Sequence, residues 1–328
     1  MFSLDQYKAA HSSAMLVDRS SQGKIAFTGA DRASFLHALL TNDIARLTAG
    51  TGCYAAYLTP QGRMISDMRV VETGGEMLMD VEPSVGQALA GRLDTLIFSE
   101  DVQVRNVTTD LSELGVHGPS AAAVLERVVG IPIARLLSLA QYDNVRAPGS
   151  RLTIVRDDSL GVAGFDVYLP AADAARLASA IVEAGAVPGD GETAETLRLE
   201  AGRPRFTVDM DTETIPLEAG IEDRAISMTK GCYVGQEVIV RVLHRGHGRV
   251  ARRLVRLVLA GDRIPAANAL IFAGDQETGR ITSAVWSPKF NAPLAFGYVH
   301  RDHAVEGTDL VVKNAAETLH AKVRQLRN

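Results

Sequence analysis

The sequence predicts an α+β protein that ends in a small antiparallel β-barrel. Residues 23–71 combine short strand-like apolar segments with a helix-spaced apolar stripe, which is typical of mixed α and β structure. From about residue 250 onward, strand-like segments follow one another, separated about every ten residues by glycines and prolines. That spacing is typical of a small antiparallel barrel.

Composition places the chain among ordinary globular proteins. Of its residues, 46% are hydrophobic and 22% are charged. The length of 328 residues is enough for two or three domains. The formal net charge of −5 gives no general argument for nucleic-acid binding. No stretch approaches the ~18 apolar residues of a membrane span, and no signal peptide is recognised. We therefore expect a cytoplasmic monomer without a membrane partner, and direct nucleic-acid binding is not expected.

Only two cysteines are present, Cys53 and Cys232. Two thiols far apart in sequence exclude a disulfide framework and a self-contained four-cysteine metal site. Their scarcity fits a reducing compartment. No metal ligands are predicted.

Local patterns define the elements before residue 200. The Gly-bounded segment 23–29 is strand-like, and Asp31 is a candidate N-cap for the helix that follows. In chain order we expect a strand over 23–29, a helix over 31–40, a hairpin with strands over 53–58 and 64–71, a strand over 77–81, a helix over 83–97, a strand over 102–104, a helix after Pro119, strands over 154–156 and 164–169, and helices over 171–184 and 193–201.

Two acids interrupt apolar strands and are candidate site residues. Asp67 lies among Ile65, Met68 and Val70, where burial of a carboxylate without a partner is costly. Asp166 lies inside the strand 164–169. Each is either a ligand-facing carboxylate or an outward-facing strand residue.

A glycine-bracketed thiol stands out at residues 230–237, which read Lys-Gly-Cys-Tyr-Val-Gly-Gln-Glu. Glycine permits backbone angles that other residues avoid, so a tight turn is expected. A cation two residues before Cys232 would favour the reactive thiolate, which makes Cys232 and Lys230 candidate catalytic residues. The alternative is a Gly-rich turn whose cysteine is a small buried apolar residue.

A basic segment follows this motif. From Val238 to Gly261 the chain carries six arginines and two histidines but no acid: Arg241, His244, Arg245, His247, Arg249, Arg252, Arg253 and Arg256. The segment is either an anion site or a basic strand face that is solvated or paired with acids elsewhere. The anion could be the glutamate tail of a cofactor, a phosphate or RNA backbone, or an acidic partner. Arginines without interleaved aromatic residues are weak support for nucleic acid.

The octapeptide 230–237 resembles the K-G-C-Y-x-G-Q-E motif of the YgfZ family, folate-binding proteins related to the T-protein (aminomethyltransferase) of the glycine cleavage system. Leu197–Gly202, Ile215–Gly220 and Gly279–Ala284 resemble further T-protein motifs in the same order. The resemblance implies a fold of two interleaved α+β subdomains around a central pocket over residues 1–245, followed by a barrel over 246–328.

The resemblance also implies a tetrahydrofolate site. It places Asp67 near the reactive nitrogen of the folate and Asp166 on the pterin ring. Further cofactor-binding residues that it implies are Arg198, Glu200, Tyr233, Gln236, Glu237 and Arg241. Because Arg198 and Glu200 are two positions apart on a helix, at most one of them should face the pocket. The chain departs from T-protein at Ser66, where T-protein has an acid, and at Ala194, where it has an arginine.

Three functions remain open under this resemblance. The first is a tetrahydrofolate-binding accessory protein that supports iron–sulfur cluster assembly or repair, and through it tRNA modification, with iron–sulfur enzymes or cluster-assembly proteins as partners and Cys232 as the working thiol. The second is a tetrahydrofolate-dependent aminomethyltransferase or demethylase, with Asp67 moving protons. The third is a folate-binding regulator that performs no chemistry.

Overall fold

The computed structural model describes residues 2–244, 248–314 and 317–326. The chain divides into two compact units, each built from segments distant in sequence. The two-sheet unit comprises Met1–Tyr57, Ser66–Ala194 and Arg224–Val234, and the barrel unit comprises Leu58–Ile65, Glu195–Asp223 and Gly235–Asn328. Among the described residues, no helix has the length and apolar content that crossing a membrane requires.

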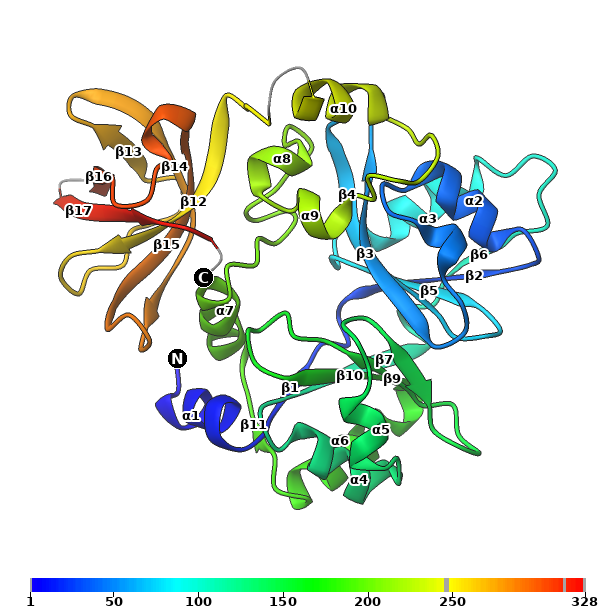
Figure 1. Ribbon diagram of the computed structural model, residues 1–328. Helices are drawn as coiled ribbons and strands as arrows, with labels where there is room; N and C mark the ends of the chain where they lie inside the picture. Colours follow the sequence, from blue (N-terminus) through cyan, green and yellow to red (C-terminus); the bar gives the residue numbers. More distant parts are fainter. Residues whose placement is uncertain (1, 245–247, 315–316, 327–328) are drawn as a thin grey trace. The chain divides into compact units, whose positions relative to one another are not determined.

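The first sheet of the two-sheet unit has five strands, coloured blue to cyan in Figure 1. Its order is β3 (Thr51–Leu58), β4 (Met64–Glu72), β5 (Met77–Val81), β2 (Gly23–Thr28) and β6 (Gln103–Asn106). Helix α3 (Gly86–Asp94) packs on β2 and β6. Helix α2 (Arg32–Leu39) contacts the short turn η1 (Ile44–Arg46) and begins at Asp31, the N-cap that the sequence indicated.

The second sheet of this unit has six strands. Its order is β11 (Val187–Pro188), β1 (Met15–Asp18), β7 (Leu111–His117), β10 (Gly164–Pro170), β9 (Thr153–Arg156) and β8 (Asn144–Arg146). Helices α4 (Ala121–Val129) and α6 (Ala174–Glu183) pack on it and share an apolar core with its inner residues. The remaining elements are α1 (Leu4–Ser12), α5 (Ile133–Leu137) and η2 (Ala171–Asp173).

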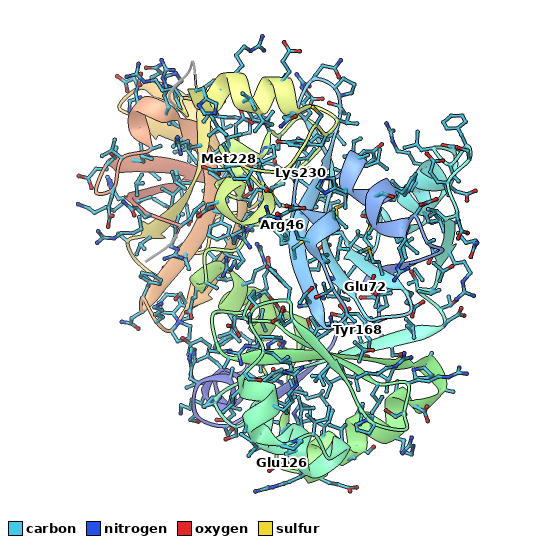
Figure 2. All side chains as sticks on the ribbon, turned by 45° about the vertical axis from the view of Figure 1, so that its right-hand side comes forward. Arg46, Glu72, Glu126, Tyr168, Met228 and Lys230 are labelled. Atoms are coloured by element: carbon cyan, nitrogen blue, oxygen red, sulfur yellow. The ribbon has the colours of Figure 1, made fainter. Side chains whose placement is uncertain are left out.

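The two sheets meet through a smaller apolar cluster. Ala26 and Leu78 of the first sheet pack with Val155 and Tyr168 of the second, and Val107 completes the contact. Tyr168 is labelled in Figure 2 at this junction. Burial of these side chains removes apolar surface from water, which is the main force that holds such layers together.

The barrel unit contains a closed six-stranded antiparallel barrel, drawn from yellow to red in Figure 1. Around the barrel the order is β12 (Arg252–Leu259), β15 (Ala292–His300), β14 (Gln276–Ser287), β13 (Leu270–Ala273), β16 (Asp309–Asn314) and β17 (Glu317–Arg324). Inward-facing residues such as Leu257, Ile281 and Val312 form its core. Helices α8 (Pro216–Ala219) and α10 (Gln236–His244) and the turn η3 (Arg301–His303) belong to this unit, whereas α7 (Gly191–Glu200) and α9 (Glu222–Ala225) span the division.

The predicted fold class is confirmed. The chain forms two sheets with helices packed on them and a C-terminal closed antiparallel barrel. The structure differs from the expectation of a basic strand face after the thiol motif, because Gln236–His244 is a helix. The expected helix over 83–97 is shorter, with bounds of Gly86–Asp94.

Candidate functional site

Asp67 on β4 is held by a tyrosine of the neighbouring strand. The Tyr54 hydroxyl on β3 donates a hydrogen bond to Asp67 Oδ2 at 2.6 Å. Burial raises the pKa of the Asp67 carboxyl above its ordinary value, and the hydrogen bond from Tyr54 only partly offsets that effect. The residue as a whole is half-buried. A carboxyl group with a raised pKa can both give and take a proton closer to neutral pH.

Aromatic and cationic side chains surround this pair. The Tyr54 ring stacks on Tyr142, with centroids 6.4 Å apart and an interplanar angle of 23°. The Arg224 guanidinium lies over the Tyr54 ring, 4.9 Å from the ring centroid. Tyr142 has φ +71°, a backbone conformation that non-glycine residues rarely adopt and that often marks functional sites. Tyr54 is thus a buried ring beside the acid, and Tyr142 is the half-buried ring of the stacked pair.

Asn42 ties the site together. Its amide donates to the carbonyls of Tyr54 at 2.8 Å and of Arg224 at 3.1 Å. The neighbouring Thr41 hydroxyl donates to the Ala225 carbonyl at 2.6 Å. The sequence indicated only a helix end here, and the contribution of Tyr54, Tyr142 and Arg224 was missed. They lie far apart in the chain, so only the polar run at residues 41–43 could have pointed to the site.

A buried ion network lies next to Asp67 on the same strand. Arg69 donates to Asp80 and to Glu113, each at 2.7 Å, and to the Tyr168 hydroxyl at 2.9 Å. It also donates to Asp166 and so joins β4 and β5 of the first sheet to β7 and β10 of the second. Although burial opposes ionisation, Arg69 lowers the pKa of Asp80 to about 2.

Asp166 is completely buried in this network. Its Oδ2 accepts from Arg69, while Arg19 lies 3.8 Å from Oδ1. Burial alone would raise the pKa of Asp166, but Arg19 and Arg69 lower it below the ordinary value. Oδ1 makes no hydrogen bond to a described residue. The predicted pterin contact stays a prediction, and Oδ1 is the atom that could make it.

His117 lies beside Asp166, with its Nε2 3.7 Å from Asp166 Oδ1. Neither ring nitrogen makes a hydrogen bond within the described part of the chain, and burial lowers the pKa of the imidazole. Gly115 and Gly164 leave room for the ring, because an added Cβ would lie 2.6 Å from Nε2 or 2.1 Å from Nδ1. The ring is therefore packed tightly, and its burial disfavours the charged imidazolium.

Lys230 does not make the contact with Cys232 that its predicted role requires. Cys232 is exposed. The Lys230 ammonium, however, donates to the carbonyls of His37 and, at 2.5 Å, of Leu40. Burial lowers the pKa of Lys230 to about 8, and the thiol that acts on this ammonium electrostatically is Cys53. Proximity in sequence thus predicted a Lys230–Cys232 pair that these contacts do not support.

Tyr233 and the helix that follows complete the motif. Tyr233 is buried, and its ring lies 5.1 Å from Lys230 Nζ. Burial raises the pKa of Tyr233 to about 12. In the barrel unit, Gln236 begins α10, and Glu237 and Arg241 are exposed on that helix. The cofactor contacts implied for these residues stay predictions.

The two predicted site residues on α7, Arg198 and Glu200, are both engaged within the barrel unit. Arg198 binds Asp209 and Glu195, each at 2.6 Å. Glu200 accepts from the Ser287 hydroxyl and from the Lys289 amide. The prediction allowed one of Arg198 and Glu200 to be paired, and both are paired here. Their implied role on the cofactor stays a prediction.

The basic segment does not form one continuous charged face. Arg252 binds Glu218 at 3.2 Å, and Arg253 donates to the Gly248 carbonyl. Arg256 is completely buried and donates to the carbonyls of Glu200 and Leu326. Arg245 and His247 lie outside the described residues. These pairings favour the structural interpretation for the arginines of β12.

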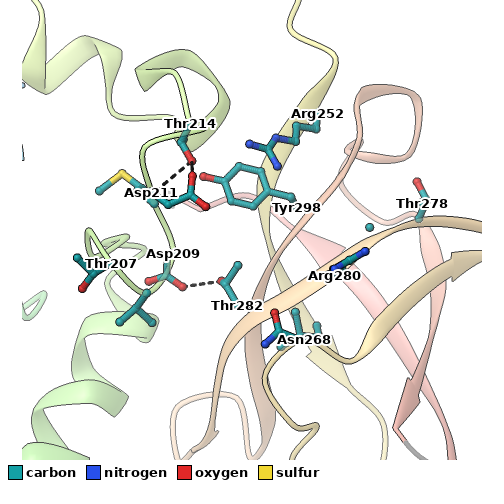
Figure 3. A pocket seen from close by; sticks show the side chains of 14 residues that line it. Thr207, Asp209, Asp211, Thr214, Arg252, Asn268, Thr278, Arg280, Thr282 and Tyr298 are labelled. Carbon is teal, nitrogen blue, oxygen red and sulfur yellow. Dashed lines mark hydrogen bonds between the residues drawn. The ribbon is translucent and has the colours of Figure 1, made fainter. Parts of the chain in front are cut away.

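A polar cavity of about 720 Å³ lies in the barrel unit (Figure 3). Asp209 and Thr282 join across it at 2.6 Å, and the Thr214 hydroxyl donates to Asp211 at 2.8 Å. Arg252 and Tyr298 form another part of its wall. Its carboxylates are largely satisfied by these internal hydrogen bonds, so the wall offers few free groups to a ligand.

Comparison with known proteins adds the family relationship. The chain matches the GCVT N-terminal domain over residues 2–230 and the glycine cleavage T-protein C-terminal barrel domain over residues 252–327. It is 28% identical to an aminomethyltransferase of Geobacillus kaustophilus over 97% of this chain and 88% of that protein. Identity to an aminomethyltransferase of Rubrobacter xylanophilus is 30%, over 90% of this chain and 78% of that protein.

A solved structure shares the fold. The glycine cleavage system aminomethyltransferase T from Bartonella henselae gives a TM-score of 0.89 at 24% identity, over 98% of this chain and 88% of that one.

Proposed function

Because this chain belongs to the glycine cleavage T-protein family, we propose that it binds a tetrahydrofolate and transfers a one-carbon group, aminomethyl or methyl, to or from that cofactor. Tetrahydrofolate is the cofactor of this family, and when bound it supplies the nitrogen that accepts the one-carbon unit. The observation that carries the proposal is the Asp67–Tyr54 pair. Tyr54 donates a hydrogen bond to the Asp67 carboxyl, and burial raises the pKa of that carboxyl.

The residues present fit a reduced pterin. Tyr142 is half-buried and stacks on the buried Tyr54 beside the acid, and a planar heterocycle packs well on such an aromatic ring. Asp166 retains a buried oxygen without a hydrogen bond, and the adjacent N–H donors of an aminopyrimidine edge suit a carboxylate.

Each side chain then has a definite task. Asp67 holds or releases the proton at the reacting nitrogen, and Tyr54 fixes the orientation of the carboxyl through its hydroxyl. Arg224 lies near enough to stabilise the ionised form of Asp67, which lowers its pKa against the effect of burial. Asn42 holds the main chain of both Tyr54 and Arg224 in place.

The test is transfer activity with tetrahydrofolate and two donors, an aminomethyl-lipoyl carrier and an N-methylated amino acid. Asp67→Asn should reduce transfer by about 10²-fold or more while tetrahydrofolate still binds in calorimetry. The absence of Asp and Arg at Ser66 and Ala194 leads us to expect weak turnover with the lipoyl donor. Absence of tetrahydrofolate binding, or full activity of Asp67→Asn, would refute the proposal.

The second candidate is the accessory function of YgfZ relatives in iron–sulfur cluster assembly or repair, and through it in tRNA modification. Exposure of Cys232 in the Lys-Gly-Cys-Tyr motif favours it, because a thiol must be accessible to meet a cluster or a partner protein. One cysteine cannot hold a cluster alone, so iron–sulfur enzymes or assembly proteins would supply the other ligands.

A rescue assay separates the two candidates. Cells that lack their own copy of such a factor would be scored for the activity of an iron–sulfur enzyme. Under the accessory function, Cys232→Ser abolishes rescue and Cys53→Ser, the matched change at the less exposed thiol, does not. Full rescue by Cys232→Ser removes this candidate and leaves the transferase.

A further inference from the structure

A second cavity, of about 470 Å³, lies in the two-sheet unit. Its lining comes from β5 and β6 of the first sheet and from β7, β8, β9 and β10 of the second, together with nearby turns. Leu78, Val107 and Tyr168 belong both to this lining and to the apolar cluster between the sheets. The cavity therefore lies at the edge of the apolar core between the sheets.

Strand register brings basic residues to this edge. On the second sheet, Arg146 is opposite Thr153, and Thr153 is opposite Tyr168. On the first sheet, Leu78 and Arg105 are both opposite Ala26. Residues opposite each other on neighbouring antiparallel strands share a face. Arg146 and Arg105 thus end two rows that face the same inter-sheet space.

Three guanidinium groups line this cavity without a protein partner. Arg105, Arg146 and Arg151 are exposed, and none makes an ion pair or a side-chain hydrogen bond to any residue that the structure describes. Arg69 and Arg198, in contrast, are fully engaged by carboxylates. Like charges that converge on one cavity repel each other, and a bound anion would relieve that repulsion.

The other lining residues define what could bind. Hydroxyl groups come from Thr73 and Thr153, and the Tyr168 ring gives an apolar wall with Leu111 and Pro170. Two acids, Glu76 and Asp110, also contribute to the lining but do not lie within ion-pair distance of the arginines. The volume falls in the range of small-molecule sites.

We propose that this cavity binds a small molecule with at least two oxyanion groups, phosphate or carboxylate, held by Arg105, Arg146 and Arg151. A guanidinium presents paired N–H donors that match the two oxygens of either group. The lining includes neither Asp67 nor Tyr54, so the proposal does not depend on folate chemistry.

The test is calorimetric titration of the full chain with pyrophosphate and, separately, with citrate at low ionic strength. Arg146→Gln and Arg105→Gln should each weaken binding by about tenfold or more, because each removes a charge-assisted hydrogen bond. Arg135→Gln, a change of an exposed arginine on α5, is the matched control and should leave the affinity unchanged. Binding should also weaken as salt is added.

Each outcome decides the matter. Tighter pyrophosphate binding that the cavity variants lose supports the site with a phosphate ligand, and the same result with citrate supports a carboxylate ligand. No saturable binding of either probe, or equal losses in Arg135→Gln and Arg146→Gln, would overturn the proposal. Unchanged tetrahydrofolate binding in Arg146→Gln would show that the two sites are independent.

Discussion

At the scale of single residues, burial and one hydrogen bond set the chemistry of the candidate site. Asp67 is partly removed from water, which raises its pKa, and Tyr54 holds it in a fixed position. The ionised form of a carboxyl in such a position is less stable than that of a carboxyl at the surface. The same environment that suits Asp67 to proton transfer should therefore cost folding stability at neutral pH.

Asp67→Asn should raise the free energy of unfolding near neutral pH. The folded-state pKa of Asp67 lies above its unfolded value, so its favourable contribution is fully present below the unfolded pKa of about 3.9 and is lost as pH rises through the folded pKa. Asparagine does not ionise and still accepts from Tyr54. We expect a gain at about pH 8 that shrinks toward about pH 4.

Urea denaturation across this pH range measures the difference. Asp173→Asn, at an exposed acid in η2, is the control and should show no such trend. A deficit in Asp67→Asn that stays constant with pH would contradict the burial argument.

At the scale of elements, the turn of the thiol motif depends on one of its two glycines. Gly235 has φ +84°, and an added Cβ would lie 2.5 Å from the Thr59 carbonyl oxygen. Gly231 has no such conformation and no atom within 4 Å of an added Cβ. Backbone geometry and crowding therefore constrain the start of α10, while the residue just before Cys232 is free to change.

Gly235→Ala should destabilise the protein by at least about 1–2 kcal/mol, because alanine pays the left-handed backbone cost and contacts main-chain atoms that cannot move away easily. Gly231→Ala, in the same motif, should change stability by no more than about 1 kcal/mol and in the stabilising direction. Thermal unfolding of the two variants gives the comparison. Equal losses of stability in the two variants would contradict the argument that only Gly235 is constrained by its backbone conformation and its neighbours.

At the scale of the whole molecule, the candidate ligand should control stability. A ligand that binds only the folded chain stabilises it by about 2.7 kcal/mol at a hundredfold excess over its dissociation constant. Asp166 makes this measurement informative, because its carboxylate serves the buried network and has one oxygen left for the pterin.

Tetrahydrofolate should raise the Tm of the wild-type protein, and Asp166→Asn should lower the Tm without ligand and also reduce the ligand-induced rise. The first effect follows because Arg69 loses a charged partner, and the second because the unused oxygen is no longer part of a carboxylate. Differential scanning fluorimetry measures both. A lowered Tm with an undiminished rise would assign Asp166 to the network alone.

The fold was largely predictable from local patterns. The barrel strands expected from about residue 250 begin with β12 at Arg252, and the strand over 164–169 matches β10 to within one residue. Helix α10 was missed because its run Val-Ile-Val-Arg-Val-Leu is rich in β-branched residues, which favour strands when considered locally. Packing in the barrel unit, where Ile239 is buried, decides the helical state.

The site was predictable only in part. Asp67 could be identified because an acid among apolar strand residues is unusual, but Tyr54, Tyr142 and Arg224 reach it through tertiary contacts that no local pattern records. Lys230 shows the opposite error, since closeness to Cys232 in sequence suggested a pair while the side chain reaches the carbonyl oxygens of α2 and its end.

The buried Arg256 guanidinium holds the main chain at Leu326 in place. It clasps the carbonyl of Leu326 at 2.6 Å, and an added Cβ on Gly202 would lie 1.7 Å from that same oxygen. Loss of Leu326 would remove one of the acceptors of a charged donor in the protein interior. A chain that lacks Leu326 should therefore unfold more easily than one that keeps it.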